Sequence, residues 1–288
     1  MSGSQHADDH LKPVAQVVRG PPGDRMAARE RWGVQVSEQS QSVREAIHEL
    51  VMANRILGRE GVVDALGHVS MRHPDDADRY FLSCSRSPAL VTEDDIMEFD
   101  LDSNPIDQRG RAMYVERPIH GCLYQARPDV HAICHSHAHQ LIPFTVTGAA
   151  IKPVWVMGAV IGTEVPLWDI REDFPHDDGM LVVNNAIGSS LAQRIGAGRA
   201  CLLAGHGGVA VAETLRHVVQ VAISLVTNAE LLTQARLLTL AQDAGELRFL
   251  ASGEIRAMAE LTFSPRALDR MWEYWATRAG YAPSETTD

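Results

Sequence analysis

Two histidines separated by one residue, His135 and His137, are the residues whose type and spacing point most directly to chemistry. They follow an alternating segment at residues 128–133, which predicts a β-strand. Side chains two apart on a strand point to the same face, so the two imidazoles should lie side by side. A third histidine, His206, stands between glycines directly after the apolar run at residues 200–204. Two histidines from one strand and one from a distant strand end are typical of a divalent metal site with an open position.

A lone buried histidine is more often a satisfied core residue than a ligand, but this arrangement would be a costly coincidence for core packing, since buried imidazoles need polar partners. His139 continues the same face beyond His137. Three successive ligands from one strand would span too far for one small ion. We therefore expect His139 to face the substrate or solvent, and His131 to be structural.

Glu116 stands at the start of a helix predicted over residues 116–126, and Arg117-Pro118 follow it. A carboxylate at this position can simply complement the helix dipole. It can also act as an acid or base on carbon beside a metal ion. The residues alone leave both interpretations open.

Strands and helices are mixed without regular alternation, which favours one α/β domain. Residues 1–40 are polar and lack periodicity, so we expect a flexible N-terminal arm, followed by a catalytic domain at residues 41–288 with a helical C-terminal extension. The other expected elements are helices at 42–57, 185–194 and 214–239, a terminal helix with Trp272, Tyr274 and Trp275, and strands at 64–72, 80–84, 154–157 and 181–183.

The composition narrows the function classes. Among 288 residues, 26 basic and 37 acidic side chains give a net charge of −11, which argues against nucleic acid or an anionic membrane as the main partner. We expect no membrane span, because no apolar stretch approaches the roughly 20 residues required, and no signal pattern is seen. The four cysteines form no C-x-x-C pair, which predicts reduced thiols in a cytoplasmic protein.

These motifs resemble the class II aldolase and adducin family. The matching segments are Glu116-Arg117-Pro118-Ile119-His120, the run Y-Q-A-R-P-D-V-H-A-I at 124–133, His135-Ser136-His137 and Gly205-His206-Gly207, in the family's order and spacing over about residues 42–245. The resemblance implies a single three-layer α/β/α domain around a mixed, largely antiparallel sheet. It also implies a homotetramer or higher oligomer with active sites at subunit interfaces.

By the same resemblance, His135, His137 and His206 hold one divalent metal ion per subunit. Glu116 is the catalytic acid or base, and it can also bind the metal when no substrate is present. The ligand set suits Zn²⁺ or Mn²⁺, and Fe²⁺ or Co²⁺ are compatible with it.

The chain departs from the family's sugar-phosphate aldolases and epimerases, in which small hydroxyl and amide groups cradle a phosphate. The corresponding stretches here contain His68, Ser83, Ser85, Arg86 and Tyr114. Arg86 suits a carboxylate, His68 a phenolate or second carboxylate, and Tyr114 stacking or hydrogen bonding. Alternatively, Arg86 only pairs with surface acids such as Glu93 or Asp94. This pattern resembles the branch of hydroxy-aromatic and hydroxypyridine-dicarboxylate decarboxylases and iron-dependent prenylated-hydroxyphenylpyruvate oxygenases.

We therefore expect a metal-dependent, non-oxidative decarboxylase of aromatic compound catabolism. Its small-molecule substrate would be an aromatic or heteroaromatic acid with a hydroxyl ortho to a carboxylate, such as a dihydroxyphthalate-like diacid. Glu116 would deliver a proton to the ring carbon, while Arg86 and His68 hold a spectator carboxylate. The alternatives are an aldolase or epimerase on a non-phosphorylated hydroxy-acid or sugar, a non-haem iron oxygenase, and a non-enzymatic assembly module. The intact metal-site residues argue against the last.

Overall fold

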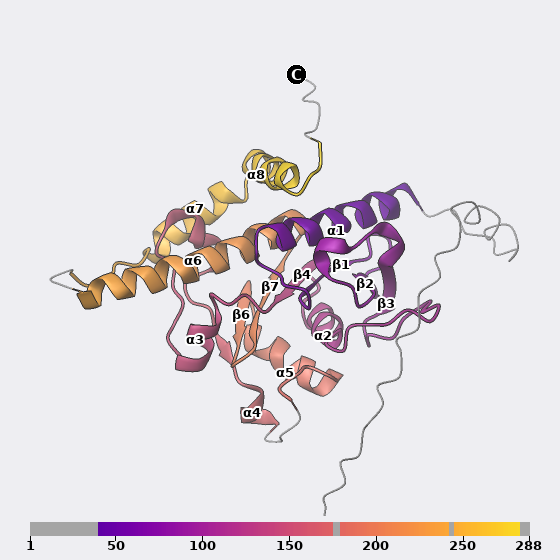
Figure 1. Cartoon of the computed structure of the whole chain (residues 1–288), viewed down its shortest axis with the longest axis horizontal. Helices are drawn as coiled ribbons and strands as arrows, with labels where there is room; N and C mark the ends of the chain where they lie inside the picture. The colour runs from indigo at the N-terminus through magenta and orange to yellow at the C-terminus, as the bar shows by residue number, and fades with distance from the viewer. Residues whose placement is uncertain (1–39, 175–178, 242–244, 283–288) are drawn as a thin grey trace, which may run out of the picture. The chain divides into compact units, whose positions relative to one another are not determined.

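A seven-stranded mixed sheet forms the centre of the domain (Figure 1). The structure, a computed structural model, describes residues 40–174, 179–241 and 245–282, so the expected N-terminal arm lies almost wholly outside the described residues. The strands are β1 (His68–Arg72), β2 (Arg79–Ser83), β3 (Ile96–Asp100), β4 (Ala132–Ser136), β5 (Leu167–Trp168), β6 (Ala200–Leu203) and β7 (Gly207–Ala212). Their order is β3-β2-β1-β4-β7-β6-β5, and every pair is antiparallel except β5 with β6.

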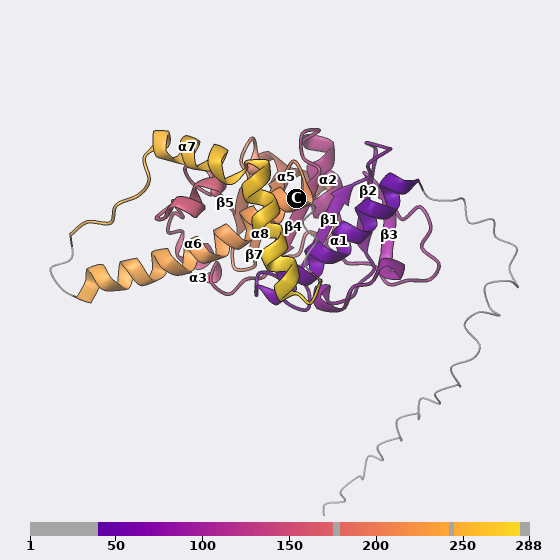
Figure 2. The ribbon, with the colours of Figure 1, turned by 90° about the horizontal axis from the view of Figure 1, so that it is seen from above.

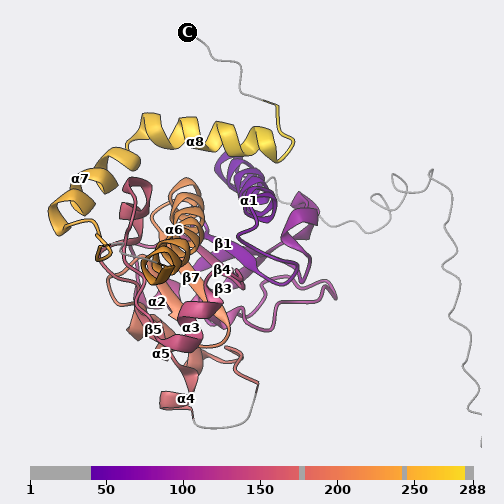
Figure 3. The ribbon, with the colours of Figure 1, turned by 60° about the vertical axis from the view of Figure 1, so that its left-hand side comes forward.

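Helices cover both faces of this sheet. The described helices are α1 (Gln41–Arg59), α2 (Pro118–Ala126), α3 (Ile142–Thr147), α4 (Ile170–Asp173), α5 (Asn185–Ile195), α6 (Leu215–Ala241), α7 (Ser252–Thr262) and α8 (Pro265–Arg278). Helices α1 and α6 lie on one face and α2 and α5 on the other, while α8 crosses the outer side of α1 and α6 (Figure 3). The expected α/β class, the mixed and largely antiparallel sheet and the terminal helix are confirmed.

Strand alternation divides the interior into two apolar cores. On β4, Cys134 faces the core beneath α1 and α6, whereas Ile133 faces the core beneath α2 and α5. Because side chains alternate along a strand, His135 lies on the same face as Ile133. The metal-site histidines are thus directed toward the layer that contains α2, the helix that Glu116 precedes.

Helix α6 is long and apolar enough to cross a membrane by length and composition, contrary to the expectation that no stretch approached this length. Of its most apolar window, 61% is buried in the domain. Val218, Val221, Leu225 and Leu232 pack into the core shared with α1. These contacts identify α6 as a core helix. Its C-terminal turns extend beyond the sheet (Figure 2).

Two expected strands are wrong. Residues 156–161 form a 3-10 helix, and residues 181–183 form no strand. In the first segment, Asn228 Oδ1 accepts the Val154 N–H and its amide donates to the carbonyl of Lys152, which replaces strand pairing. The sequence prediction also missed β3, because this strand directly follows an acidic segment, Glu93–Asp95, that has the composition of a loop.

Candidate metal centre

The end of β4, the turn between β6 and β7 and the turn before α2 bring the predicted ligands together. On β4, His135 pairs with His68 of β1 on one side and with Val209 of β7 on the other. His137 follows the strand by one residue, and His206 lies in the turn between β6 and β7. That turn requires glycine: Gly205 has a φ of +64°.

The four expected metal-site side chains converge on one point. Nε2 of His137 lies 3.1 Å from Nε2 of His135 and 3.0 Å from Nε2 of His206. Oε2 of Glu116 lies 3.5 Å from Nε2 of His135 and 3.3 Å from Nε2 of His206. All four ligand atoms lie within 4.8 Å of one another. His137 and His206 are only partly buried, so the cluster is reached from the surface.

The hydrogen-bond partners of Nδ1 in His135 and His137 determine which nitrogen of each ring carries the hydrogen. Nδ1 of His135 lies 3.2 Å from the carbonyl oxygen of Gly208, and Nδ1 of His137 lies 3.2 Å from Oδ1 of Asp64. Because a carbonyl and a carboxylate only accept, each Nδ1 carries the hydrogen and donates it. Both Nε2 atoms therefore face the cluster as lone pairs. Among the described residues, Nδ1 of His206 is buried without a partner.

Glu116 is a buried carboxylate in the turn before α2, two residues ahead of the helix start. The Val182 N–H donates to its Oε1 at 2.9 Å, so Oε2 is the atom presented to the histidines. Burial alone would raise the pKa of Glu116, but the adjacent imidazoles of His135 and His206 outweigh this and lower the pKa below its usual value. Burial also lowers the pKa of His135, which keeps that imidazole neutral.

This donor set fits a divalent cation. Two imidazole lone pairs and a carboxylate oxygen face one another with no hydrogen between them, an arrangement that a cation stabilises. With ligand distances of about 2.0–2.1 Å, tetrahedral coordination would separate two nitrogens by about 3.4 Å, close to the spacing of the Nε2 atoms. Three imidazoles and a carboxylate suit several first-row metals.

Of the six predicted substrate-binding residues, His68 lies directly beside this cluster, and Tyr114 and Ser83 lie behind His68. The ring of His68 packs 5.0 Å from that of His135 and 4.5 Å from that of Tyr114. The Ser83 hydroxyl donates to the Tyr114 hydroxyl at 3.4 Å, and Tyr114 donates to the backbone carbonyl of Arg86. Burial raises the pKa of Tyr114, so the phenol keeps its proton. His68, Tyr114 and Ser83 thus form a buried wall of polar rings and one hydroxyl next to the imidazoles.

Three other predicted substrate contacts are not brought to the cluster. Ser85, Arg86 and His139 are exposed, and in the described part of the chain none of them forms a side-chain hydrogen bond or ion pair with the four clustered side chains. Arg86 pairs with Asp95, its Nη1 lying 3.2 Å from Oδ1. Arg86 thus pairs with a surface acid, as the alternative interpretation had it, although the acid is neither Glu93 nor Asp94. A substrate contact for these three residues remains a prediction.

Sequence reasoning missed two residues that support the site. The expected strand at 64–72 would begin at Asp64, but Asp64 lies in a turn, where it accepts the Leu66 and Gly67 N–H groups and contacts Nδ1 of His137. His120 belongs to the segment Glu116–His120 that resembles the family and has no predicted role, yet its Nε2 lies 2.6 Å from Nδ1 of His68. The Asp64-x-Leu66-Gly67 turn pattern was the one local signal available.

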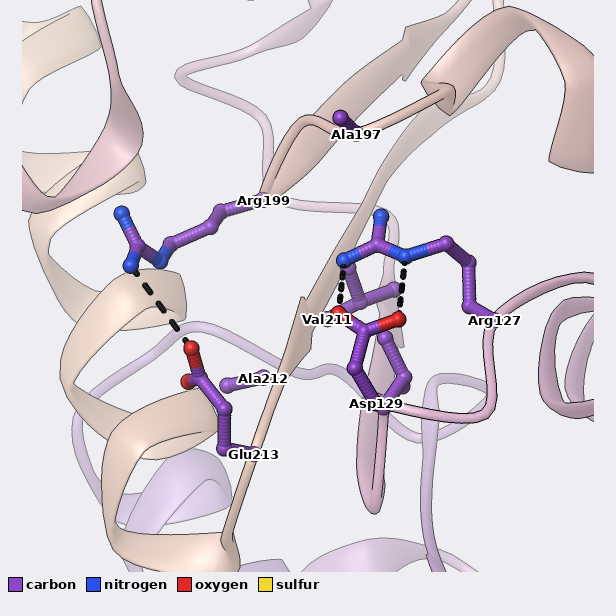
Figure 4. Close-up of a pocket in the computed structure, with 8 residues that line it drawn as sticks. Arg127, Asp129, Ala197, Arg199, Val211, Ala212 and Glu213 are labelled. Atoms are coloured by element: carbon purple, nitrogen blue, oxygen red, sulfur yellow. Dashed lines mark hydrogen bonds and ion pairs between the residues drawn. The ribbon is translucent and has the colours of Figure 1, made fainter.

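A cavity of about 240 Å³ lies at the opposite ends of the same strands (Figure 4). Arg127 and Asp129 precede β4 and form a two-point ion pair, and Arg199 pairs with Glu213 just after β7. The β4–β7 register, from Ala132 opposite Ala212 to Ser136 opposite Gly208, separates this cavity from the histidines by the strand length. Its charges are paired within the protein, and it contains none of the candidate metal ligands.

Comparisons with known proteins agree with this geometry. The family model described as class II aldolase and adducin N-terminal domain matches residues 48–233. The decarboxylase tropJ of Talaromyces stipitatus is 32% identical over 246 residues, covering 80% of this chain and 92% of the relative. The 3,4-dihydroxyphthalate decarboxylase of Arthrobacter keyseri is 30% identical over 200 residues, covering 66% of this chain and 77% of the relative.

A solved structure shares the fold. An aldolase II superfamily protein from Pseudomonas syringae superposes with a TM-score of 0.68 at 19% identity, covering 88% of this chain and 96% of the other. The family match spans β1, the Glu116 turn, the paired histidines of β4 and the His206 hairpin. The chain therefore belongs to the class II aldolase and adducin family.

Proposed function

We propose that this protein is a metal-dependent, non-oxidative decarboxylase of a hydroxy-substituted aromatic or heteroaromatic carboxylic acid. The observation that carries the proposal is the wall of polar rings beside the imidazole cluster, with His68 4.5 Å from Tyr114 and 5.0 Å from His135. A planar, anionic substrate fits such a wall better than a flexible sugar phosphate does. The names of two relatives, a decarboxylase and a dihydroxyphthalate decarboxylase, support the same reaction class.

In this proposal His135, His137 and His206 hold the cation. When bound, the cation supplies Lewis-acid stabilisation of the negative charge that develops as the carboxylate leaves. The donor set and the roughly 3 Å spacing of the Nε2 atoms support this assignment.

The chain's own residues orient the substrate and move one proton. His68 and Tyr114 hold the ring and its oxygens, and Glu116 accepts the proton of the substrate hydroxyl through Oε2. The bond between ring and carboxylate then breaks, carbon dioxide leaves, and the electron pair stays on the ring. Glu116 returns its proton to that ring carbon, and solvent reprotonates the product oxygen. The Val182 N–H keeps Oε1 of Glu116 fixed while Oε2 works.

The direct test is release of carbon dioxide under strict anaerobiosis. Metal-stripped protein is reloaded with Zn²⁺, Mn²⁺, Co²⁺ or Fe²⁺ and given a panel of ortho-hydroxy aromatic diacids that includes 3,4-dihydroxyphthalate. We expect metal-dependent carbon dioxide release in the absence of oxygen from at least one diacid. Turnover that needs both Fe²⁺ and oxygen would establish an oxygenase instead. Cleavage of hydroxy-acids or sugars, without any decarboxylation, would establish an aldolase.

A further inference from the structure

A buried chain of four polar side chains connects β1 with α2 beside the metal centre. On β1, His68 and Ser70 are two residues apart, and on α2, His120 and Tyr124 are four apart, so each pair shares one face of its element. All four are at most 1% exposed. Leaving a buried polar group without a hydrogen-bond partner costs about 1–3 kcal/mol. We therefore expect the polar groups of these four side chains to hydrogen-bond to one another.

The contacts run in one continuous line. Tyr124 OH lies 2.8 Å from Ser70 Oγ, which lies 2.6 Å from Nδ1 of His120. Nε2 of His120 lies 2.6 Å from Nδ1 of His68. Beyond His68 come the rings of His135 and Tyr114, so the line ends at the metal centre.

Counting hydrogens gives this line a direction. Within the described residues, the Tyr124 hydroxyl has Ser70 Oγ as its hydrogen-bond partner, so its hydrogen points to Ser70. Ser70 then gives its own hydrogen to Nδ1 of His120. Since Nδ1 accepts, Nε2 of the neutral His120 carries the ring hydrogen and donates it to Nδ1 of His68. His68 must therefore carry its hydrogen on Nε2.

The opposite direction leaves a hydrogen unsatisfied inside the line, at Ser70 or Tyr124. The favoured direction leaves only the Nε2–H of His68, at the end next to the metal centre, without an acceptor among the described residues. If Nδ1 of His68 donated to His120 and His120 donated to Ser70, either Ser70 or Tyr124 would keep a buried O–H without an acceptor among the described residues. Burial, together with the nearby His135, lowers the pKa of His120 to about 3, so His120 is uncharged near neutral pH. Burial also raises the pKa of Tyr124, which therefore keeps the hydrogen that starts the line.

We propose that His120 is a positioning residue that, with Ser70 and Tyr124, fixes His68 with its hydrogen on Nε2, so that His68 presents an N–H donor to an anionic oxygen of the substrate. The identity of that oxygen rests on the proposed function, whereas the position of the hydrogen does not. A donor at this place selects an ionised oxygen and would repel another donor.

The first experiment reads the hydrogen position directly. Zinc-loaded protein labelled with ¹⁵N-histidine is studied by solid-state NMR, which does not depend on oligomer size, and the His68 and His120 signals are assigned from single His→Gln variants. We expect Nε2 of His68 to be protonated and its Nδ1 to be unprotonated, with the same pattern in His120. Protonation of His68 on Nδ1 would overturn the proposal, whatever reaction the enzyme catalyses.

The second experiment breaks the line at Ser70. Ser70→Ala removes the donor to Nδ1 of His120, so we expect the Nδ1-protonated form of His68 to grow and kcat/KM for the active diacid to fall by roughly tenfold, through KM. Adding His120→Gln should restore the Nε2-protonated form, because an amide N–H can donate to His68 without help from Ser70. Zinc content should stay unchanged in both variants.

The matched control is Tyr80→Phe. Tyr80 is buried, stacks near Tyr124 and His120, and bonds through its hydroxyl to Ser103 rather than to the line. This variant should keep the His68 hydrogen position and KM. A folded Ser70→Ala variant with unchanged His68 signals would show that the line only fills the core and does not fix the His68 hydrogen. An equal KM change in Tyr80→Phe would show the same. Absence of carbon dioxide release from every diacid would refute the proposed function while the NMR result still decides the position of the His68 hydrogen.

Discussion

At the scale of single residues, the partner of Nδ1 in each imidazole determines whether Nε2 presents a lone pair or a hydrogen. Gly208 O and Asp64 Oδ1 take the Nδ1 hydrogens of His135 and His137, which leaves lone pairs toward the cluster. In the buried line of side chains from Tyr124 to His68, His120 is inferred to donate to Nδ1 of His68, which leaves the hydrogen on Nε2 of His68 for the substrate. His135 and His68, which are paired across neighbouring strands, thus take opposite roles, metal acceptor and substrate donor, because the partners of their Nδ1 atoms differ.

Asp64 makes a residue-scale prediction. Asp64→Asn keeps an oxygen acceptor but removes the charge that stabilises the Nδ1–H of His137, so we expect metal affinity to fall by roughly tenfold, at the low end of such outer-partner effects. Competition with a chromophoric chelator measures this. Asp76→Asn is the control, since Asp76 also accepts a backbone N–H two residues on but holds Arg79 instead of a histidine. Equal affinities for the wild type and Asp64→Asn would contradict this role.

At the scale of elements, the metal ligands could be predicted from the alternation of side chains along a strand. The residues that position these ligands and His68 could not, because their contacts depend on tertiary structure. Residues 135 and 137 share a face by local geometry alone, and motif order added His206 and Glu116. By contrast, the contact between Asp64 and His137 and that between His120 and His68 join elements 73 and 52 residues apart. No local pattern fixes the β1–β4 register behind the first contact, or the packing of α2 on β1 behind the second. The exposed position of Arg86 likewise follows from its pairing with Asp95 across a loop.

The β6–β7 hairpin gives an element-scale prediction. A Cβ on Gly207 would overlap the carbonyl oxygen of Ser136 on β4, where backbone cannot yield cheaply. We expect Gly207→Ala to lower the free energy of unfolding by about 1–3 kcal/mol and to weaken metal binding by displacing His206. Denaturant unfolding and metal analysis check both. Gly253→Ala is the control, because nothing lies near its added Cβ and alanine favours a helix, so this variant should be neutral or slightly stabilised. Wild-type stability in Gly207→Ala would refute the close approach.

The loop before β3 gives a prediction on pH. Burial would raise the pKa of Asp95, but hydrogen bonds from Thr92 and the charge of Arg86 outweigh it and lower the pKa. A lowered folded pKa means that the stabilisation is complete above the unfolded value of about 3.9 and is lost as pH falls through the folded pKa. Asp95→Asn should cost about 1 kcal/mol at pH 7, as loss of a cap does.

The measurement is urea unfolding of wild type and Asp95→Asn between pH 7 and pH 3. We expect a constant difference in unfolding free energy down to about pH 5 and a shrinking difference below about pH 4. A difference that grows on acidification would contradict the assigned pairing with Thr92 and Arg86.

At the scale of the whole molecule, one chain leaves apolar surface unused. Leu237, Leu238 and Leu240 near the end of α6 are 60%, 68% and 83% exposed, on the part of the helix that extends beyond the sheet (Figure 2). Exposed apolar clusters of this kind mark interaction surfaces. We propose that the working form is a homo-oligomer, with a tetramer as the expected state, in which these leucines are covered.

Light scattering coupled to size-exclusion chromatography tests the assembly. We expect a mass that is a multiple of the 31.6 kDa chain, and a smaller mass for Leu238→Glu, because an ionised carboxylate cannot be buried cheaply in an apolar contact. Leu90→Glu, at another exposed leucine far along the chain (59% exposed, against 68% for Leu238), should leave the mass unchanged. A monomer at every concentration would contradict the proposal.

The number of metal ions per chain that gives full activity tests whether His135, His137, His206 and Glu116 form the catalytic metal site. Metal-free protein is titrated with Zn²⁺ or Mn²⁺ while anaerobic carbon dioxide release is followed with the best diacid of the panel. His137→Ala is compared with His48→Ala, an exposed histidine that also contacts a carboxylate, that of Glu93. We predict that activity rises to a plateau at one metal ion per chain in wild type and His48→Ala, and that His137→Ala shows neither stoichiometric binding nor release. Metal content and carbon dioxide release that both survive in His137→Ala would contradict the account.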